Sequence, residues 1–352
     1  MPRVWDVPVH DSTRVRDARV AAERAAALAG LDAKRTAALS LVATELATNL
    51  VKHAGGGQLL VELVPPALPA DAAVPARLVQ IAAIDHGPGI ADVTAALSDG
   101  FSTARSLGAG LGTCRRVAHD FALHSVPGRG TVALARIGAA PGTTPAEDPA
   151  AVRAGGINVP FARAEYSGDA WTWVRAGARA TLMLADGLGH GPEAARASSA
   201  AVEELHRSAH LSPADCLGRL DSALRGTRGA AVAVAQVDTT AGLLRFAGVG
   251  NIGARLRTGD TWRSLLSRPG IIGVHRPRTL HEERMPWAAD GTLILHSDGL
   301  PSRWTPPAEA AMLTADPAVV AAGVIRDAGS AARPARDDTA VAVLAPTLPE
   351  RP

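Results

Sequence analysis

The chain has few cysteines, lysines and aromatic residues. Among its 352 residues there are 2 cysteines and 1 tyrosine, and aromatic residues make up 3%. Cys114 and Cys216 are far apart and form no CxxC pair, which argues against a zinc site or a disulfide framework and fits a reducing compartment. Lys34 and Lys52 are the only lysines, so arginine carries nearly all of the positive charge.

The sequence also lacks long apolar runs and a strong charge of one sign. Its first 17 residues, MPRVWDVPVHDSTRVRD, contain no apolar core of a signal peptide, and no run approaches the roughly 20 residues of a membrane span. The formal net charge is +2, and the small basic excess is spread along the chain. This balance gives no sign of nucleic-acid binding. We therefore expect a soluble cytoplasmic protein with neither a nucleic-acid nor a membrane partner.

The length suggests two domains. Residues 138–156, GAAPGTTPAEDPAAVRAGG, are rich in Pro, Gly, Ala and Thr and have no periodicity, which is typical of a linker. We expect an N-terminal domain over residues 1–137 and a C-terminal domain over residues 157–346, with no internal repeat between them.

Hydrophobic patterns predict a mixed α/β organisation on both sides of this segment. Before it, one helix is expected from a cap at Asp11 or Ser12 to Ala29, a second from Asp32 to about His53, and a third after Gly112. Strands are expected in the first half near residues 4–9, 58–64, 78–84, 121–126 and 131–137. In the second half we expect strands near 171–176, 180–185, 230–237, 242–248, 292–297 and 339–344, and helices near 192–209, 213–224 and 317–328.

The second predicted helix carries two polar residues beside its apolar stripe. Glu45 and Asn49 lie one turn apart, on the row next to the stripe formed by Leu39, Val42, Leu46 and Leu50. An asparagine amide oxygen can ligate Mg²⁺, and a glutamate can accept a proton from a nucleophile or a water. Taken alone, the pair also fits the polar edge of a surface helix.

The stretch IAAIDHGPGI shifts the balance towards a binding site. Asp85 follows a predicted strand, and its acceptor-only carboxylate can take a hydrogen bond from an adenine amino group. Gly87 and Gly89 let the backbone turn tightly and approach a ligand. In PGRGTVAL, Thr131 begins a strand within possible reach of the same base.

A glycine-rich stretch, SLGAGLGT, precedes the third predicted helix. Gly108, Gly110 and Gly112 leave backbone N–H groups free to meet phosphates, with the helix dipole aiding them. No Gly-Lys-Ser/Thr follows, so this is not a Walker motif. Arg105 in the same segment could touch a γ-phosphate, although solvent exposure is its commoner role.

Taken in order, ELATNLVKHA, DHGPGI, SLGAGLGT and GRGT resemble the N, G1, G2 and G3 boxes of the Bergerat-fold (GHKL) ATPases over roughly residues 32–137. The phrase DGFST and the spacing look most like the stressosome switch kinases of the RsbT type. The resemblance implies Mg-ATP bound with Asn49 on the metal, Asp85 on adenine and the glycines over the phosphates. It also implies that Glu45 is the general base for a substrate hydroxyl.

Acidic residues recur at strand ends in the second half, within EYSGDAW, LADGLGHGPEAA, LHSDGL and ARDDTAV. Packed strands could bring together Asp169, Asp186, Asp298 and Asp337. Carboxylates gathered in this way repel one another unless cations neutralise them, and oxygen-only ligands favour Mg²⁺ or Mn²⁺ over zinc. Gly187 could add a backbone carbonyl, whereas His190 and His296 are more typical of structural positions.

The motifs SGDAW, ADGLGHG, GVGNIG, SDGL and RDDT resemble the SpoIIE-type PPM phosphatases, most closely the stressosome feedback phosphatases of the RsbX type, over roughly residues 158–345. The resemblance implies an α/β/β/α sandwich with a binuclear Mn²⁺ or Mg²⁺ centre. Asp186 matches the bridging aspartate, and Asp338 could substitute for Asp337. Thr172 stands where the wider family often has a second aspartate.

Together, the two halves predict an α+β protein in which a serine/threonine kinase is fused to an opposing phosphatase. Resemblance suggests a STAS-domain substrate acting in trans, either an anti-sigma antagonist or a stressosome scaffold, and it allows a homodimer. One alternative is a switch that holds ATP and sequesters a sigma factor or another protein, so that only the phosphatase does chemistry. A scaffold with neither activity fits less well, because both motif sets look intact.

Overall fold

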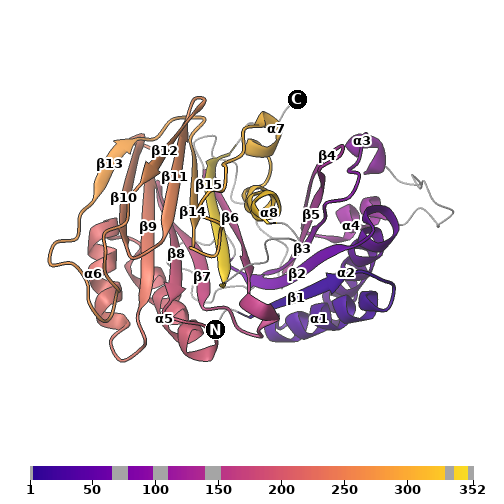
Figure 1. Cartoon of the computed structure of the whole chain (residues 1–352), viewed down its shortest axis with the longest axis horizontal. Coiled ribbons are helices and arrows are strands. Elements are labelled where there is room, and N and C mark those ends of the chain that lie inside the picture. The colour runs from indigo at the N-terminus through magenta and orange to yellow at the C-terminus, as the bar shows by residue number, and fades with distance from the viewer. Residues whose placement is uncertain (1–2, 66–77, 98–109, 139–151, 330–336, 348–352) are drawn as a thin grey trace. The chain divides into compact units, whose positions relative to one another are not determined.

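The computed structural model describes residues 3–65, 78–97, 110–138, 152–329 and 337–347 (Figure 1). The chain divides into two compact units: of the described residues, 4–65, 78–97 and 110–138 form one unit, and Arg3, 152–329 and 337–347 form the other. Each unit has its own sheets and helices, so the expected two-domain α+β class is confirmed. Arg105 and Gly108 lie outside the described residues.

The first unit is built on one antiparallel sheet with the strand order β1-β2-β3-β5-β4. All five of its predicted strands are present. The strands are β1 (Val4–Val9), β2 (Gly57–Val64), β3 (Leu78–Ile84), β4 (Asp120–Val126) and β5 (Gly130–Gly138).

Two long helices, α1 (Arg14–Ala29) and α2 (Ala33–Ala54), pack together against this sheet. The predicted cap of α1 was wrong, because Thr13 is the N-cap and Asp11 instead accepts a hydrogen bond from the Thr13 backbone N–H at 2.8 Å. A tight turn before the helix thus uses the Asp11 carboxylate. The short helices α3 (Val93–Ala96) and α4 (Leu111–Val117) complete the described part of the unit.

Helix α2 follows its sequence pattern closely. Asp32 caps it by accepting a hydrogen bond from the Arg35 backbone N–H at 2.8 Å, and Gly55 ends it with a positive φ of 72°. The whole predicted apolar stripe is at most 2% exposed and packs into the core: Leu39, Val42, Leu46 and Leu50. Because this stripe faces the core, Glu45 and Asn49 on the neighbouring row lie at the border of the core.

The second unit contains two antiparallel five-stranded sheets. The first has the order β13-β10-β9-β8-β7 and the second the order β12-β11-β14-β15-β6. The first sheet comprises β7 (Asp169–Ala176), β8 (Arg179–Gly187), β9 (Ala230–Asp238), β10 (Leu243–Val249) and β13 (Glu283–Pro286). The second comprises β6 (Val152–Val159), β11 (Gly253–Thr258), β12 (Thr261–Leu265), β14 (Thr292–His296) and β15 (Thr339–Pro346).

Helices cover the outer faces of these two sheets. Helices α5 (Pro192–Ser208) and α6 (Pro213–Ala223) pack on the first sheet, and α8 (Pro317–Ala328) packs on β6 and β15 of the second (Figure 1). A 3-10 turn, η1 (Phe161–Arg163), precedes β7, and α7 (Ala310–Leu313) precedes α8. Between the layers, β15 contacts β7 and β8. The second unit is therefore the expected α/β/β/α sandwich.

Four strands were not anticipated from the pattern: β6, β11, β12 and β13. Strand β6 begins inside the segment whose composition suggested a linker. A Cβ at Gly155 would lie 2.6 Å from the Ala318 backbone nitrogen, and one at Gly156 would lie 2.7 Å from the Trp171 ring. These glycines serve close packing of a strand, although in sequence they look like flexible linker residues.

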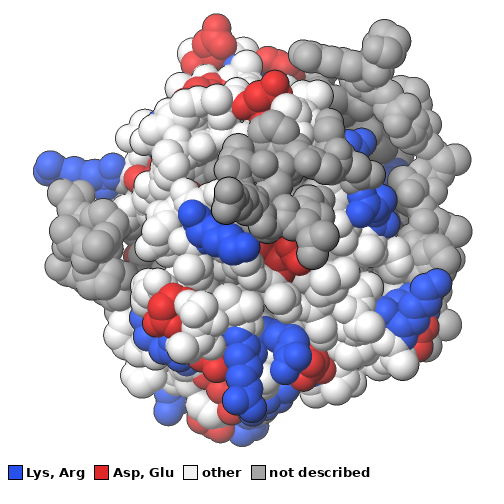
Figure 2. All heavy atoms as spheres, turned by 90° about the vertical axis from the view of Figure 1, so that its right-hand side faces the viewer, with Lys and Arg blue, Asp and Glu red and all other residues white. Residues whose placement is uncertain are grey.

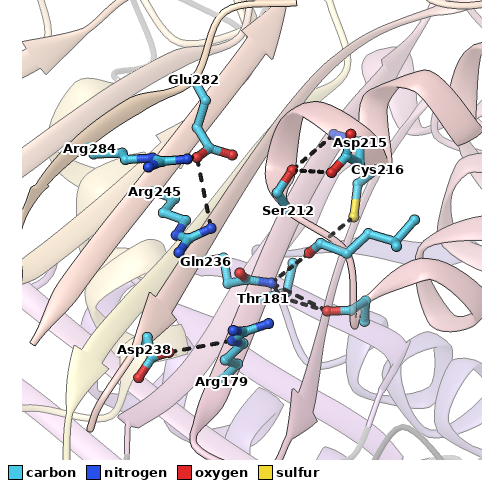
Figure 3. Close-up of polar contacts among 12 residues, drawn as sticks. Arg179, Thr181, Ser212, Asp215, Cys216, Gln236, Asp238, Arg245, Glu282 and Arg284 are labelled. Atoms are coloured by element: carbon cyan, nitrogen blue, oxygen red, sulfur yellow. Dashed lines mark hydrogen bonds and ion pairs between the residues drawn. The ribbon is translucent and has the colours of Figure 1, made fainter. Parts of the chain in front are cut away.

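Buried polar contacts attach the helical layer to the first sheet (Figure 3). The Gln236 side-chain amide donates to the Thr181 hydroxyl at 3.1 Å and to the Leu211 carbonyl at 2.9 Å. The Cys216 thiol donates to the Ser208 carbonyl at 3.1 Å, and burial raises its pKa to about 11. Cys216 and Cys114 are both free and buried in the structure.

Charged side chains of opposite sign lie next to one another on the face shown in Figure 2. On the first unit's helices, Arg14 pairs with Asp17 at 2.7 Å and Arg19 with Glu23 at 3.7 Å. Exposed pairs of this kind contribute little to stability, about 0–1 kcal/mol each. Within the described parts of the chain, no helix combines the length and the apolar character needed to cross a membrane.

Candidate functional site

The first candidate site lies where the end of β3 meets the start of β5. The Asp85 carboxylate is 7% exposed, and its Oδ1 accepts hydrogen bonds from the Gly87 backbone N–H at 2.8 Å and the Thr131 backbone N–H at 3.1 Å. The Thr131 hydroxyl is 2.8 Å from that of Ser125, which also accepts the Ile90 N–H. Two backbone donors thus hold Asp85 in one orientation beside Thr131.

Glycines allow the two turns around Asp85 to pack closely. A Cβ at Gly87 would lie 2.6 Å from the Ala54 Cα at the end of α2. Gly89 has a φ of 72° and lies against the Val126 carbonyl. Gly130 has a φ of 93° and lies against the Asp85 carbonyl. Neither position leaves room for a Cβ. The predicted reason for Gly87 and Gly89 was approach to a ligand; the structure shows approach to neighbouring backbone.

Glu45 and Asn49 lie on α2, partly buried, at the predicted border of the apolar stripe. Loss of solvent around Glu45 raises the pKa of its carboxyl, with Lys52 acting in the opposite direction. Burial, followed by the charge of Glu45, raises the pKa of Cys114 to about 12. Cys114 lies on α4, which packs against α2. A carboxylate with a raised pKa is suited to accept a proton.

Helix α4 begins at the glycine-rich stretch. Gly110 is its N-cap and offers no side chain to the first N–H groups, and a Cβ at Gly110 would meet no atom within 4 Å. Gly112 is buried within the helix. The ends of α2, β3, β5 and α4 therefore carry Asn49, Asp85, Thr131 and Gly110, which are the parts predicted for a nucleotide site.

The second candidate site lies at one end of β7 and β8. Asp169 and Asp186 are paired across these neighbouring strands, and Asp169 is fully buried. Neither carboxylate oxygen of Asp169 reaches a hydrogen-bond partner among the described residues. Burial, followed by the charge of Asp186, raises its pKa well above the ordinary range, and the nearby Ser297 hydroxyl offsets only part of this. A buried carboxylate left in this state needs a proton or a cation.

Asp186 is surrounded by further carboxylates. Burial and then the charge of Asp298 raise its pKa to about 7, with smaller contributions from Asp337 and Asp338. Asn251 opposes this shift, because its side-chain amide donates to Asp298 at 2.7 Å and to Asp186 at 3.3 Å. The structure thus brings together all four predicted acidic residues, together with Gly187, which follows Asp186 at the end of β8.

This donor set fits a divalent cation in its chemistry. Every side chain is an oxygen donor, and the mutual repulsion of the carboxylates is the penalty that bound cations remove. Within the described residues, however, no three His, Cys, Asp or Glu side chains are arranged to hold one ion. Further donors such as the Gly187 carbonyl and water would therefore have to complete the coordination.

Asp337 and Asp338, left open by the sequence, have different surroundings. Asp338 is 4% exposed, and its two oxygens accept the Phe161 and Gly168 backbone N–H groups, each at 2.7 Å. Asp337 is exposed: its carboxylate accepts the Asp338 N–H at 2.9 Å, and its backbone carbonyl accepts the Thr339 hydroxyl at 3.2 Å. Asp338 thus clamps the turn before β7, which leaves Asp337 the better candidate for a metal ligand.

Two polar residues near the site were not assigned from the sequence. Asn251 lies in the GVGNIG motif, between Gly250 and Ile252, and nothing in this local sequence indicates that its amide bridges two aspartates. Thr172 points to the helical layer, where its hydroxyl is 3.1 Å from the His206 ring. His190 is exposed, and His296 accepts a hydrogen bond from the Trp304 indole at 3.2 Å, so neither contacts the carboxylates through a described hydrogen bond.

Comparison with protein families assigns both units. The model for a histidine kinase-like ATPase domain matches residues 9–136, and that for stage II sporulation protein E (SpoIIE) matches residues 176–346. The chain joins a histidine kinase-like ATPase domain to a SpoIIE domain. The first match includes Glu45, Asn49 and Asp85, and the second includes Asp186 and Asp298 but begins after Asp169.

The ATPase domain also resembles a curated protein, the serine/threonine-protein kinase RsbT of Bacillus subtilis (strain 168). The two are 41% identical over 95 residues, which is 27% of this chain. The chain spans 66% of the length of that kinase, just under two thirds.

Two solved structures are similar to part of the chain. A chain of the bacterial stressosome, a modular system adapted to control secondary messenger signalling, is 30% identical, with a TM-score of 0.49, over 55% of this chain and 99% of its own length. RsbX in complex with magnesium is 18% identical, with a TM-score of 0.46, over 55% of this chain and 94% of its own length.

Proposed function

We propose that the chain is a bifunctional partner-switching regulator. Its ATPase domain, proposed for residues 1–137, transfers phosphate from ATP to a serine or threonine. Its SpoIIE domain, predicted from the sequence for residues 157–346 and here proposed to begin with β6 at Val152, removes that phosphate. The similarity to RsbT supports a STAS-domain protein as the common substrate, acting in trans.

The observation that carries the proposal is the carboxylate cluster of the SpoIIE domain. Asp186, whose pKa is raised to about 7, shares the Asn251 amide with Asp298 and lies opposite Asp169 in the register of β7 and β8. The buried Asp169 carboxylate has no hydrogen-bond partner among the described residues. Mn²⁺ or Mg²⁺ bound there would neutralise these charges and activate water towards a phosphate ester. Asp186, Asp169, Asp298, Asp337 and the Gly187 carbonyl would hold the ions. Asn251 holds Asp186 and Asp298 at a fixed separation.

In the ATPase domain, Asp85 would recognise adenine, with Thr131 beside it. Asn49 would hold Mg²⁺, and Gly87, Gly89, Gly108, Gly110 and Gly112 would border the nucleotide. ATP supplies the transferable phosphate. Glu45 would take the proton from the substrate hydroxyl, and the raised pKa of its carboxyl supports that role over a purely structural one.

The test is phosphate transfer from labelled ATP to a STAS-domain protein encoded beside this gene. The full chain would be assayed with Mg²⁺ and then with Mn²⁺ added, as wild type, Asn49→Ala and Asp186→Ala. We expect no labelling by Asn49→Ala and more accumulated phosphoprotein with Asp186→Ala than with wild type. If ATP binds and no variant labels the partner, the kinase proposal fails, and a switch that sequesters its partner becomes the better account.

A further inference from the structure

One exposed arginine lies beside the carboxylate cluster. Strands β8 and β9 pair so that Asp186 is opposite Ala231 and Gly187 is opposite Ala230. The segment after β8 and the segment before β9 therefore leave the sheet at the same edge. The Leu188 backbone N–H donates to the Gly229 carbonyl at 3.0 Å, which fixes the two segments together. Arg228 is thus brought next to the turn that follows Asp186.

The turn after Asp186 is shaped to admit the Arg228 side chain. Gly189 has a φ of 86°, and a Cβ at this position would lie 3.1 Å from the Arg228 Nη1. The Gly189 carbonyl approaches Gly168, whose N–H is bound by Asp338. The turn is therefore contacted by the arginine and by the backbone that leads into Asp169.

The Arg228 guanidinium has no acidic partner among the described residues. It is exposed and makes no ion pair or side-chain hydrogen bond with any described residue. Arg225, three residues earlier, pairs with Asp221 at 3.8 Å. Arg228 thus offers a free planar fork of donors at the edge of the candidate metal site, the geometry that phosphate oxygens favour.

Two exposed apolar side chains flank the same position. Leu188, next to the metal-site residue Gly187, is 50% exposed, and Val274 is 61% exposed. A Cβ at Gly229 would lie 2.8 Å from the Val274 Cγ2, so both apolar groups border the residues adjoining Arg228. A cation set between apolar groups suits a phosphorylated peptide better than a small free phosphate ester.

We propose that Arg228 binds the phosphate of the phosphoprotein substrate, while Leu188 and Val274 receive the peptide beside the phosphorylated residue. This inference rests on the proposed phosphatase function and adds its substrate-binding residues. The guanidinium would hold the dianionic phosphate against the carboxylate-rich site. Contacts of Leu188 and Val274 with the peptide would make the site selective for a protein substrate over small phosphate esters.

The experiment compares Arg228→Ala, Arg228→Lys and the matched control Arg225→Ala in the full chain with Mn²⁺. With a phosphoserine peptide, we expect KM to rise about tenfold for Arg228→Ala, with kcat falling less, and to recover in part for Arg228→Lys. Arg225→Ala should match wild type. Leu188→Ala should raise KM for the peptide and leave that for p-nitrophenyl phosphate unchanged. Equal KM values for the two alanine variants at Arg228 and Arg225 would overturn the assignment.

A second measurement does not depend on turnover. Phenylglyoxal modifies accessible arginines, and peptide mass mapping reports each site separately. Inorganic phosphate with Mn²⁺ should protect Arg228 and leave Arg225 reactive, whereas equal protection of the two would contradict the proposal. If wild type hydrolyses neither substrate but Arg228 is still protected, the proposed phosphatase function fails while the anion site stands.

Discussion

Replacing Asp186 with asparagine should make the metal-free SpoIIE domain more stable at alkaline pH. The substitution keeps the shape of the side chain and an oxygen acceptor for the Asn251 amide. It removes a negative charge that burial and Asp298 disfavour. A residue proposed to be central to function would thus be destabilising when no cation is present.

The magnitude follows from the pKa. The Asp186 pKa rises from 3.8 to about 7 on folding, and about 3 units correspond to about 4 kcal/mol. Because the repulsion is shared with Asp169 and Asp298, we expect about 2–4 kcal/mol. A carboxyl whose pKa is higher in the folded chain stabilises the fold below its unfolded pKa, and this stabilisation is lost as pH rises through the folded pKa. Wild type in EDTA should therefore lose stability between about pH 4 and pH 8.

The assay is urea unfolding of the full chain in EDTA at several pH values, followed by tryptophan fluorescence. Five of the six tryptophans lie in the SpoIIE domain, so the signal reports mainly on that domain. Asp186→Asn should be the more stable protein at pH 8 and show a shallower pH dependence. Added Mn²⁺ should stabilise wild type more than the variant.

The control is Asp260→Asn, which removes a charge from a fully exposed side chain in the same domain. It should leave stability near that of wild type at every pH. The reasoning is refuted if Asp186→Asn is no more stable than wild type at pH 8 without metal. An unchanged pH dependence in that variant would refute it equally.

Three further predictions concern both domains. Glu45→Gln should lower the rate of phosphate transfer about 100-fold or more while nucleotide binding is kept. The wild-type rate should fall as pH drops through the raised pKa of Glu45. Full activity in the variant would exclude Glu45 as the base. Gly130→Ala should destabilise the ATPase domain by more than ~3 kcal/mol and weaken ATP binding, because its Cβ would collide with the Asp85 carbonyl. Gly128→Ala, in the same turn but facing open space, should cost only about 1–2 kcal/mol, and equal unfolding midpoints for the two variants would contradict this. Asp338→Asn should destabilise the SpoIIE domain by about 3 kcal/mol, because the Asp338 carboxylate accepts two backbone N–H groups. Asp337→Asn should leave stability unchanged and weaken Mn²⁺ binding, as measured by calorimetry. The opposite pattern would exchange the two roles.

Much of the architecture could be predicted from local patterns. The apolar stripe of α2, its Asp32 cap and the Gly55 stop are visible in the sequence and recur in the structure. Most strands of both domains were predicted because their apolar runs are bounded by turn residues. Strands β11 and β12 were missed because they form a hairpin rich in arginine and threonine, and β12 lies at a sheet edge. Strand β6 was missed because its glycines resemble linker residues.

The sequence by itself determined which residue types are available for chemistry. Spacing placed Glu45 and Asn49 on one helical row, and turn signals placed aspartates at strand ends. Such assignments depend on neighbours in the chain, within a turn of helix or at the end of a strand. Local patterns record these relations directly.

Only the tertiary structure decided how these groups act on one another. The pairing of β7 with β8 sets Asp169 opposite Asp186. Burial, followed by the charge of Asp298, raises the pKa of Asp186, and the Asn251 amide opposes the shift. The tertiary structure also gave Asp337 and Asp338 different surroundings. The Asp338 oxygens accept hydrogen bonds from backbone N–H groups, whereas Asp337 is exposed. These outcomes depend on burial and on distances between residues far apart in the chain. Electrostatic and desolvation energies follow those distances, which no local pattern encodes.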